Sequence, residues 1–124
     1  MTTTELGADD FATTVAEHEI VLVDFWASWC GPCRQFAPVY EKASEQHPDI
    51  VFAKVDTEAE QALASAAQIT AIPTLMVFKD GSLVHSRAGA LPGPALEQVI
   101  TAVRELDVER LRAEAAALES RRSA

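Results

Sequence analysis

The chain of 124 residues has two cysteines, Cys30 and Cys33, which are separated only by Gly31-Pro32. Their segment, Trp29–Cys33, closely follows the apolar run Ile20–Trp26 and directly precedes a helix-like stretch, so the cysteines lie at an expected strand-to-helix junction. A thiol at the start of a helix faces unpaired backbone N–H groups and the positive end of the helix dipole, which favour the thiolate. The spacer lets the second thiol reach the first, so that a mixed disulfide with a substrate can be resolved within the molecule. The pattern therefore predicts thiol–disulfide exchange.

Two other roles for this cysteine pair stay open from the residues alone. A structural zinc ion usually takes four Cys or His ligands, whereas His18, His47 and His85 are scattered without ligand spacing. A zinc site shared across a dimer remains compatible with the sequence. The cysteines could also be inert core thiols, although Gly31-Pro32 suits a tight turn into a helix better than core packing. We expect redox chemistry and no bound metal.

Length and composition limit the kind of protein this is. A chain of 124 residues with 48% hydrophobic residues predicts one domain with an ordinary core. The net charge of −9 argues against nucleic acid or an anionic membrane as a partner, because phosphate-rich surfaces bind clustered Lys and Arg. The N-terminus has neither a basic start nor an apolar stretch, and no run approaches membrane-spanning length, so we expect a cytoplasmic protein. In that reducing compartment a lone cysteine pair indicates catalysis or metal binding rather than a structural crosslink.

Strand-like and helix-like segments alternate along the first half of the chain, which predicts parallel strands joined by crossover helices. The apolar runs Ile20–Trp26 and Ile50–Asp56 are rich in β-branched and aromatic residues and are too short for buried helices. Farther on, Asp80-Gly81 is flanked by the strand-like runs Thr74–Lys79 and Leu83–Ala88, which predicts a hairpin and therefore a mixed sheet. Helices are expected over Ala8–Glu17, over Pro32–Gln46 with a kink at Pro38, over Thr57–Gln68, and after Pro94 with a core stripe of Leu96, Val99, Ile100, Val103 and Leu106.

The segment around the cysteines resembles the active-site signature of the thioredoxin family. The run from Val23 to Cys33 reads VDFWASWCGPC, and Ile72-Pro73-Thr74 together with Gly89 resembles other characteristic residues of the family. The likeness covers about residues 6–106 and is to bacterial cytosolic members. The Gly-Pro spacer separates the chain from glutaredoxin-like and disulfide-isomerase-like relatives.

This resemblance implies an α/β thioredoxin fold over residues 1–106, with a central mixed β-sheet flanked by four α-helices, and a C-terminal helical or disordered extension at residues 107–124. It also implies a protein-disulfide reductase in which reduced Cys30 attacks a disulfide of a client protein and Cys33 releases the product. Cys30 is expected to be the more exposed thiol, because it lies at the junction nearest solvent, whereas Cys33 is already inside the expected helix. A flavin-dependent thioredoxin reductase using NADPH would restore the dithiol, and the chain itself would bind no cofactor and act as a monomer. An interaction subunit or holdase without turnover, and a reductant dedicated to one client, stay open as alternatives.

Two charged residues interrupt the buried strands. Asp24 lies between Val23 and Phe25, where an unpaired carboxylate is expensive to bury and stays protonated to higher pH, unless the position is a strand edge or a solvated bulge. The matching family residue lies behind the resolving cysteine and moves its proton, and the resemblance implies the same role for Asp24. Lys54 interrupts the second strand, and its family counterpart lies close to that acid. The alternative for Lys54 is a side chain that extends to solvent from a strand end.

A rim of small and apolar residues is expected around Cys30 and would accept varied protein substrates. The resemblance implies that Pro73 is cis and packs against the disulfide, where an X-Pro bond would expose the preceding backbone to an extended substrate segment. An ordinary trans proline at a strand start is the alternative. Ser28 and Arg34 depart from the residues common in the family, and Arg34 keeps a positive charge beside the thiols. The expected substrate-binding residues are Trp29, Gly31, Pro32, Ile72, Pro73, Gly89 and Ala90.

The extension after Leu106 consists of strong helix formers, but its apolar residues follow a stripe rotated away from that of the preceding helix. An isolated helix of this length is marginal in water unless its apolar line finds a partner. Both a solvated, fraying tail and a helix that self-associates or docks a partner are therefore open, and residues 121–124 are expected to be disordered. The rotated stripe consists of Val108, Leu111, Ala115 and Leu118.

Overall fold

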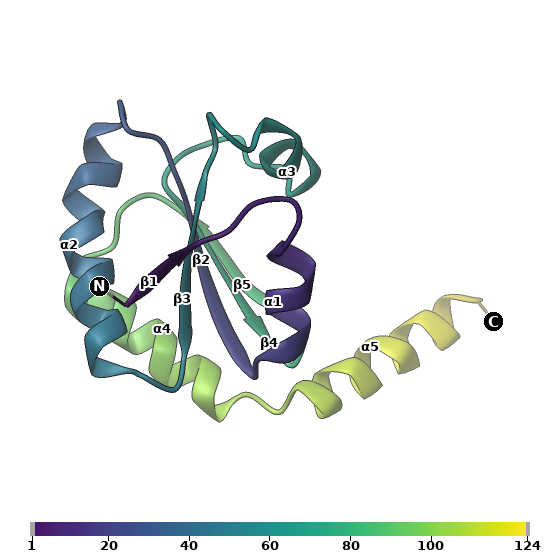
Figure 1. Cartoon of the computed structure of the whole chain (residues 1–124). Helices are drawn as coiled ribbons and strands as arrows, with labels where there is room; N and C mark the ends of the chain where they lie inside the picture. The colour runs from purple at the N-terminus through teal and green to yellow at the C-terminus, as the bar shows by residue number, and fades with distance from the viewer. Residues whose placement is uncertain (1, 124) are drawn as a thin grey trace.

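A five-stranded mixed β-sheet forms the centre of the computed structural model, which describes residues 2–123 (Figure 1). Its strands are β1 (Thr3–Glu5), β2 (Ile20–Trp26), β3 (Val51–Asp56), β4 (Thr74–Lys79) and β5 (Ser82–Ala88). They lie in the order β1-β3-β2-β4-β5, with β1, β3 and β2 parallel. β4 is antiparallel to β2, and β5 is antiparallel to β4. The mixed sheet and the hairpin predicted from the sequence are therefore confirmed.

Helices cover both faces of this sheet (Figure 1). They are α1 (Phe11–Glu17), α2 (Gly31–Gln46), α3 (Gln61–Ala66), α4 (Gly93–Glu105) and α5 (Val108–Ser123). Phe36 of α2 and Leu96 of α4 pack in one buried cluster, whereas Val15 of α1 and Leu63 of α3 belong to a cluster on the opposite face. The four flanking helices are confirmed, and α5 follows them. None of the helices in the described part of the chain is both long and apolar enough to cross a membrane.

The central strand β2 supplies side chains to both layers of the core. Leu22 packs in the cluster beneath α2 and α4, and Val23 packs in the cluster beneath α1 and α3. By the same alternation Asp24 points to the side of α2. It lies opposite Lys54 of β3 and Leu75 of β4, and only 1% of its surface is exposed. The alternatives of a strand edge and a solvated bulge for Asp24 are therefore wrong.

Two elements near the edge of the sheet differ from the sequence-based expectation. No strand is predicted over Thr3–Glu5, yet β1 pairs with the open edge of β3, and the Leu6 N–H continues the ladder with a 2.8 Å hydrogen bond to the Lys54 carbonyl. The helix predicted over residues 57–68 is shorter, because Asp56 Oδ1 accepts the Glu58 N–H at 2.9 Å and holds the first residues in a turn. Helix formers alone do not reveal such a competing turn.

The end of α4 is held by a buried lysine that is not predicted from the sequence. Lys79, the last residue of β4, is 5% exposed. Its Nζ donates hydrogen bonds to the carbonyl oxygens of Val103 (2.9 Å), Arg104 (3.0 Å) and Leu106 (2.7 Å). A helix end leaves such carbonyls without partners inside the helix, and a cation there also complements the helix dipole. α4 therefore ends at this point, and a short break separates it from α5.

The first turn of α5 is attached to the domain at the β4–β5 turn. Val108 is buried. Arg112 donates from Nε to Ser82 Oγ at 3.0 Å and from Nη2 to the Asp80 carbonyl at 2.5 Å. These contacts join the extension to the end of the sheet where β2 begins, because β4 runs antiparallel to β2.

The rest of α5 projects away from the sheet (Figure 1). Its described residues beyond Val108 are exposed, including Leu111 and Leu118. Residues 121–123 continue the helix, so the disorder expected for them is wrong, and Ala124 lies outside the described residues. The division of the chain into residues 1–106 and 107–124 as separate units stays a prediction.

Candidate active site

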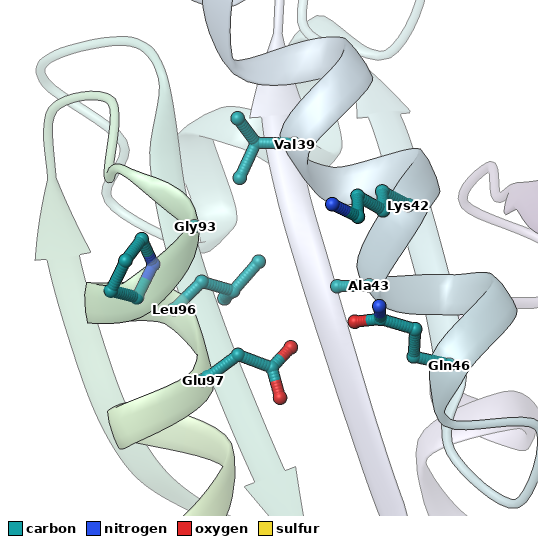
Figure 2. Close-up of a pocket in the computed structure, with 8 residues that line it drawn as sticks. Val39, Lys42, Ala43, Gln46, Gly93, Leu96 and Glu97 are labelled. Carbon is teal, nitrogen blue, oxygen red and sulfur yellow. The ribbon is translucent and has the colours of Figure 1, made fainter.

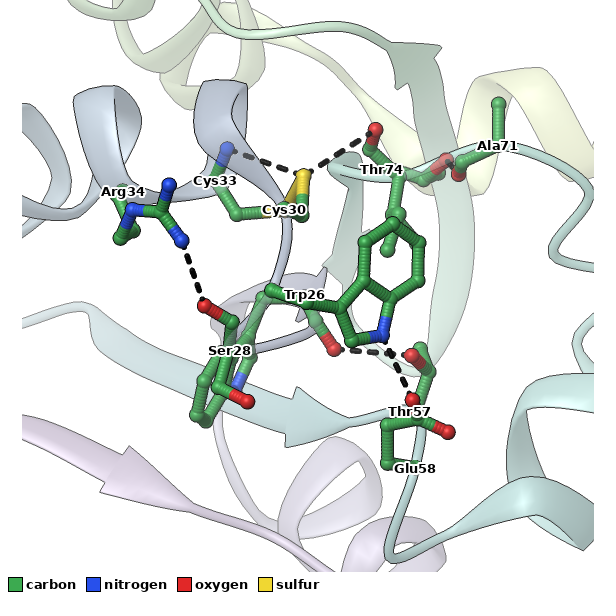
Figure 3. Close-up of a disulfide and its surroundings, with 11 residues drawn as sticks. Trp26, Ser28, Cys30, Cys33, Arg34, Thr57, Glu58, Ala71 and Thr74 are labelled. Atoms are coloured by element: carbon green, nitrogen blue, oxygen red, sulfur yellow. Dashed lines mark hydrogen bonds between the residues drawn. A yellow bond between two sulfur atoms is a disulfide. The ribbon is translucent and has the colours of Figure 1, made fainter.

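Cys30 and Cys33 are joined by a disulfide at the N-terminus of α2 (Figure 3). Cys30 is the N-cap residue, and Pro32 lies in the first turn, where a missing N–H leaves no hydrogen bond unmade. The two Cα atoms are 5.2 Å apart, within the range of protein disulfides. The Cys33 N–H donates to Cys30 Sγ over 3.2 Å. The helix start therefore directs an N–H group and the positive end of its dipole at the sulfur of Cys30.

The two cysteines differ in their surroundings and not in their exposure. In this oxidised form the exposed fraction is 4% for Cys30 and 3% for Cys33, so the greater exposure expected for Cys30 is not found. Cys30 Sγ lies 3.8 Å from the Ile72 carbonyl oxygen, whereas Cys33 lies inside the helix and lines a small cavity beneath it. Among residues 2–123, no group of three or more His, Cys, Asp or Glu side chains is placed to hold a metal ion.

The loop before β4 brings two of the expected substrate-binding segments together. The Ile72-Pro73 peptide bond is cis, so the expectation from the resemblance is confirmed and the trans alternative is wrong. The Pro73 carbonyl accepts the Gly89 N–H at 2.8 Å, which places Gly89 and the following Ala90 beside this loop. Gly89 has φ +102°, and a Cβ atom there would meet nothing within 4 Å, so the backbone conformation rather than crowding favours glycine.

Trp29 is the most prominent side chain of the rim, because 64% of its surface is exposed. Its Nε1 donates to Glu58 Oε1 at 2.6 Å, which fixes the ring at the edge of the site. Pro32 is also exposed, and Gly31 and Ile72 are half-buried. Glu58 is not predicted from the sequence, because the contact joins residues 29 positions apart. The sequence indicates this contact only through the position of Glu58, two residues after the end of β3, which lies beside β2 and the cysteine segment.

Asp24 is a buried acid without a hydrogen-bond partner. Neither of its carboxylate oxygens makes a hydrogen bond with any described residue. Burial raises the pKa of Asp24 from 3.8 to about 7, the ammonium of Lys54 partly offsets this rise, and the carboxylate of Glu5 adds to it. The group therefore changes its protonation state near neutral pH, which is the range in which a general acid or base is useful.

Lys54 is half-buried and points toward Trp26. Its Nζ lies 4.9 Å from the centroid of the Trp26 ring, and it makes no ion pair with a carboxylate of the described residues within 4.0 Å. Lys54, Trp26 and Cys33 line one small cavity of about 90 Å³, to which Arg34 also contributes. The structure thus brings Lys54 and Cys33 to the same cavity, while Asp24 lies next to Lys54 across the strands.

The two departures from the common family residues contact each other. Arg34 Nη1 donates to the Ser28 carbonyl at 2.9 Å (Figure 3). The guanidinium is therefore held across the segment that carries the cysteines. The positive charge expected beside the thiols is present, and it is positioned by a backbone oxygen and not by the Ser28 hydroxyl.

A larger hollow of about 370 Å³ lies elsewhere, between α2 and α4 (Figure 2). Leu96 and Ala43 form apolar parts of its wall, and Lys42, Gln46 and Glu97 project around it. None of its lining residues is a cysteine or one of the expected site residues. Because no thiol lines it, this hollow is not the redox site.

The fold and the site together define a dithiol–disulfide oxidoreductase, in which a Cys-x-x-Cys pair opens the helix that follows a central parallel strand. A family model described as Thioredoxin matches residues 2–102. The chain belongs to the thioredoxin family. It accordingly acts on protein disulfides and receives electrons from a reductase, as members of this family do in general.

Individual relatives agree with this assignment. A Streptomyces coelicolor protein named as a thioredoxin is 54% identical over 110 residues, which cover 89% of this chain and 82% of the relative. Thioredoxin 1 of Synechococcus elongatus is 47% identical over 92 residues, covering 73% of this chain and 86% of the relative. The solved structure of a mutant thioredoxin from Halobacterium salinarum superposes with a TM-score of 0.78 at 36% identity, over 85% of this chain and 93% of that one.

Proposed function

We propose that this chain is a general protein-disulfide reductase of the cytoplasm, which acts as a monomer and is recycled by an NADPH-dependent thioredoxin reductase. The main support is the position of Cys30, whose sulfur caps α2 and accepts the Cys33 N–H. In the reduced protein the same N–H and the helix dipole would stabilise a thiolate on Cys30. A dithiol that must stay reduced to work fits a reducing compartment.

The reaction assigns unequal roles to the two cysteines. The Cys30 thiolate attacks one sulfur of a client disulfide, the client S–S bond breaks, and one client thiolate leaves. Cys33 then loses its proton, and its sulfur attacks Cys30 Sγ in the mixed disulfide. This step forms the Cys30–Cys33 bond and releases the second client thiolate. The client has gained two electrons, the dithiol has lost two, and the product is the disulfide form described above.

Asp24 is proposed as the group that accepts the proton of Cys33, and Lys54 as the charge that tunes it. Asp24 is buried on the side of α2 with no hydrogen-bond partner among the described residues, so its oxygens are available for a proton. With a pKa of about 7, it is partly ionised at neutral pH and can both take and return a proton. Lys54 borders the same cavity as Cys33 and lies next to Asp24 across the strands.

The rim around Cys30 is proposed to bind an extended client segment. Trp29 and Pro32 are exposed beside the sulfur, and the Ile72 carbonyl lies 3.8 Å from it. Backbone groups beside Pro73 offer hydrogen bonds that do not depend on the client's side chains. Gly31, Gly89 and Ala90 add little bulk, so that varied clients can approach the disulfide.

A coupled assay of insulin reduction with NADPH and a bacterial thioredoxin reductase tests this function. The wild-type chain is expected to reduce insulin at catalytic amounts, and Cys30→Ser is expected to abolish the activity. Cys33→Ser is expected to retain the attack and to accumulate mixed disulfides that a reductant releases. An inactive wild type that still prevents aggregation of unfolded clients would support a holdase instead. Accumulation of mixed disulfides by Cys30→Ser would reverse the two roles.

A further inference from the structure

A row of charged residues crosses three strands behind the cysteines. Glu5 of β1 is the register partner of Lys54 of β3, and Lys54 is the register partner of Asp24 of β2. Register partners in neighbouring strands place their side chains on the same face of the sheet. One ammonium is therefore flanked by two carboxylates, with the buried Asp24 on its inner side and the exposed Glu5 on its outer side.

The ammonium of Lys54 is not engaged by the inner carboxylate. Its Nζ lies over the Trp26 ring, and Asp24 has no hydrogen-bond partner among the described residues. An ammonium next to a buried carboxylate would ordinarily turn toward it, because attraction is strongest where water is excluded. The Trp26 ring holds the ammonium in its observed position, and the carboxylate of Glu5, the register partner of Lys54 on β1, lies on the side away from Asp24. Burial raises the pKa of Glu5, and the ammonium of Lys54 partly offsets that rise, so the two groups attract each other although they form no ion pair within 4.0 Å.

We propose that Glu5 is a positioning residue for the proton at Asp24: its carboxylate attracts Lys54 toward the edge of the sheet and so leaves Asp24 without an ion pair. Through this competition a residue of the short edge strand β1 sets how readily Asp24 exchanges a proton with Cys33. This inference rests on the role of Asp24 proposed above. Glu5 itself does not touch the reacting sulfurs.

The other charged and titratable groups around Asp24 do not supply the same effect. On β3, Asp56 faces the same side, but its Oδ1 accepts the Glu58 N–H. On α2, the Tyr40 hydroxyl donates to the Ala53 carbonyl at 2.7 Å, and Glu41 accepts from Thr2 and Thr3 at the start of β1. Arg34 is bound to the Ser28 carbonyl, Cys33 is in the disulfide, and the β4 neighbour of Asp24 is the apolar Leu75.

The test is an NMR titration of the Asp24 side-chain carboxyl in the full chain, with no client present. Glu5→Gln keeps the size of the side chain and removes its charge, so the midpoint of the Asp24 titration is expected to move to lower pH. The pH at which Cys33 resolves a mixed disulfide half-maximally should move in the same direction. Glu45→Gln is the matched control, because it removes another exposed carboxylate, on α2, and should leave the midpoint unchanged.

A second variant separates attraction through Lys54 from direct repulsion between the two carboxylates. In a Lys54→Met background, Glu5→Gln is expected to move the Asp24 midpoint much less than it does in the wild type. An equal shift in both backgrounds, or a Glu5→Gln midpoint equal to that of the wild type, would overturn the inference. Because the titration needs no turnover, these results are independent of whether insulin is reduced. An amide spectrum of each variant confirms that the measured species is folded.

Discussion

Asp24 and Lys79 are both buried charged residues of the same sheet, but only Lys79 has hydrogen-bond partners among the described residues. Asp24 is 1% exposed, and its oxygens have no hydrogen-bond partner in the described part of the chain. Lys79 is 5% exposed, and its three hydrogen bonds go to carbonyls at the end of α4. Lys79 lies opposite Ile20, where β2 begins, whereas Asp24 lies toward the end that leads to Cys30.

The difference separates a structural charge from a reactive one. A buried charge with a full set of hydrogen bonds is stabilised in one protonation state and holds its neighbours together. A buried carboxylate without partners is less stable when ionised, so it changes its protonation within the range where enzymes work. Burial alone therefore does not identify a functional residue, whereas burial with unsatisfied oxygens does mark a candidate.

Removal of the unsatisfied charge is expected to give the largest change in stability, and the change is a gain. The pKa of Asp24 is about 7 in the folded protein and ordinarily 3.8, so the folded state binds more protons than the unfolded state between these values. Stability from this group therefore falls as pH rises through that window. At pH 8, Asp24→Ala is expected to raise the free energy of unfolding by up to about 4 kcal/mol through loss of the buried charge. The cavity left by the smaller side chain lowers this gain by about 1 kcal/mol. Urea denaturation at pH 8 measures this difference.

For Asp24→Ala, low pH provides a control for the change in stability, and the rate of disulfide exchange should fall. Below the ordinary pKa the carboxyl is protonated in both states, so the gain should disappear near pH 3. Resolution of a mixed disulfide should slow by about tenfold or more if Asp24 is the proton acceptor of Cys33, as proposed above. A less stable Asp24→Ala protein at pH 8 would show that the carboxylate is satisfied, and the contrast with Lys79 would fail.

Removal of the satisfied charge is expected to act in the opposite direction. Lys79→Met keeps the apolar stem but leaves the carbonyls of Val103, Arg104 and Leu106 without their donor. A loss of about 2–3 kcal/mol in the free energy of unfolding is expected at pH 7. Lys42→Met, at an exposed lysine of α2, is the matched control and should change stability by less than about 0.5 kcal/mol. Equal effects of the two substitutions would mean that the buried hydrogen bonds contribute little.

The weakest effect is expected where α5 meets the β4–β5 turn. Arg112→Ala removes the hydrogen bonds to Ser82 and Asp80 on an exposed surface, and should cost less than about 1 kcal/mol. Arg110→Ala, whose partner Glu114 lies within α5, is the control and should leave the domain's melting temperature unchanged. A loss of several kcal/mol in Arg112→Ala would show that α5 is an integral part of the fold.

Truncation after Leu106 is expected to leave insulin reduction intact. The truncated chain keeps all three carbonyls bound by Lys79, and α5 is attached at the end of the sheet opposite the cysteines. The insulin assay and light scattering on both chains measure the outcome. Loss of activity, or a dimer that disappears on truncation, would show that the exposed Leu111 and Leu118 have a partner.

Local patterns predict most of the site. The strand, the Cys30–Cys33 segment and the following helix are adjacent in the chain, so apolar runs and turn residues are enough to place them. The burial of Asp24 follows from its apolar neighbours in a short central strand. The position of Pro73 beside the cysteines is different, because only the family resemblance predicts it and the residues themselves do not.

Contacts between distant segments account for what the sequence does not predict. Lys79 reaches carbonyls 24 to 27 residues away, and Glu58 reaches Trp29 across 29 residues. Neither side chain differs in type from the exposed charged residues around it. β1 consists of three polar residues, which is too short for an alternating apolar and polar pattern. It forms only because β3 leaves an open edge.

The short edge strand also has a consequence for local opening. β1 has three residues, lies at the edge of the sheet and pairs only with β3, whereas β2 has seven residues and a partner on both sides. Fewer buried contacts hold β1, so it detaches at a lower free energy than the strands beside it. In hydrogen–deuterium exchange the Leu6 amide should therefore lose protection before the amides of β2. During each such opening Glu5 leaves the neighbourhood of Lys54 while the Cys30–Cys33 site remains folded.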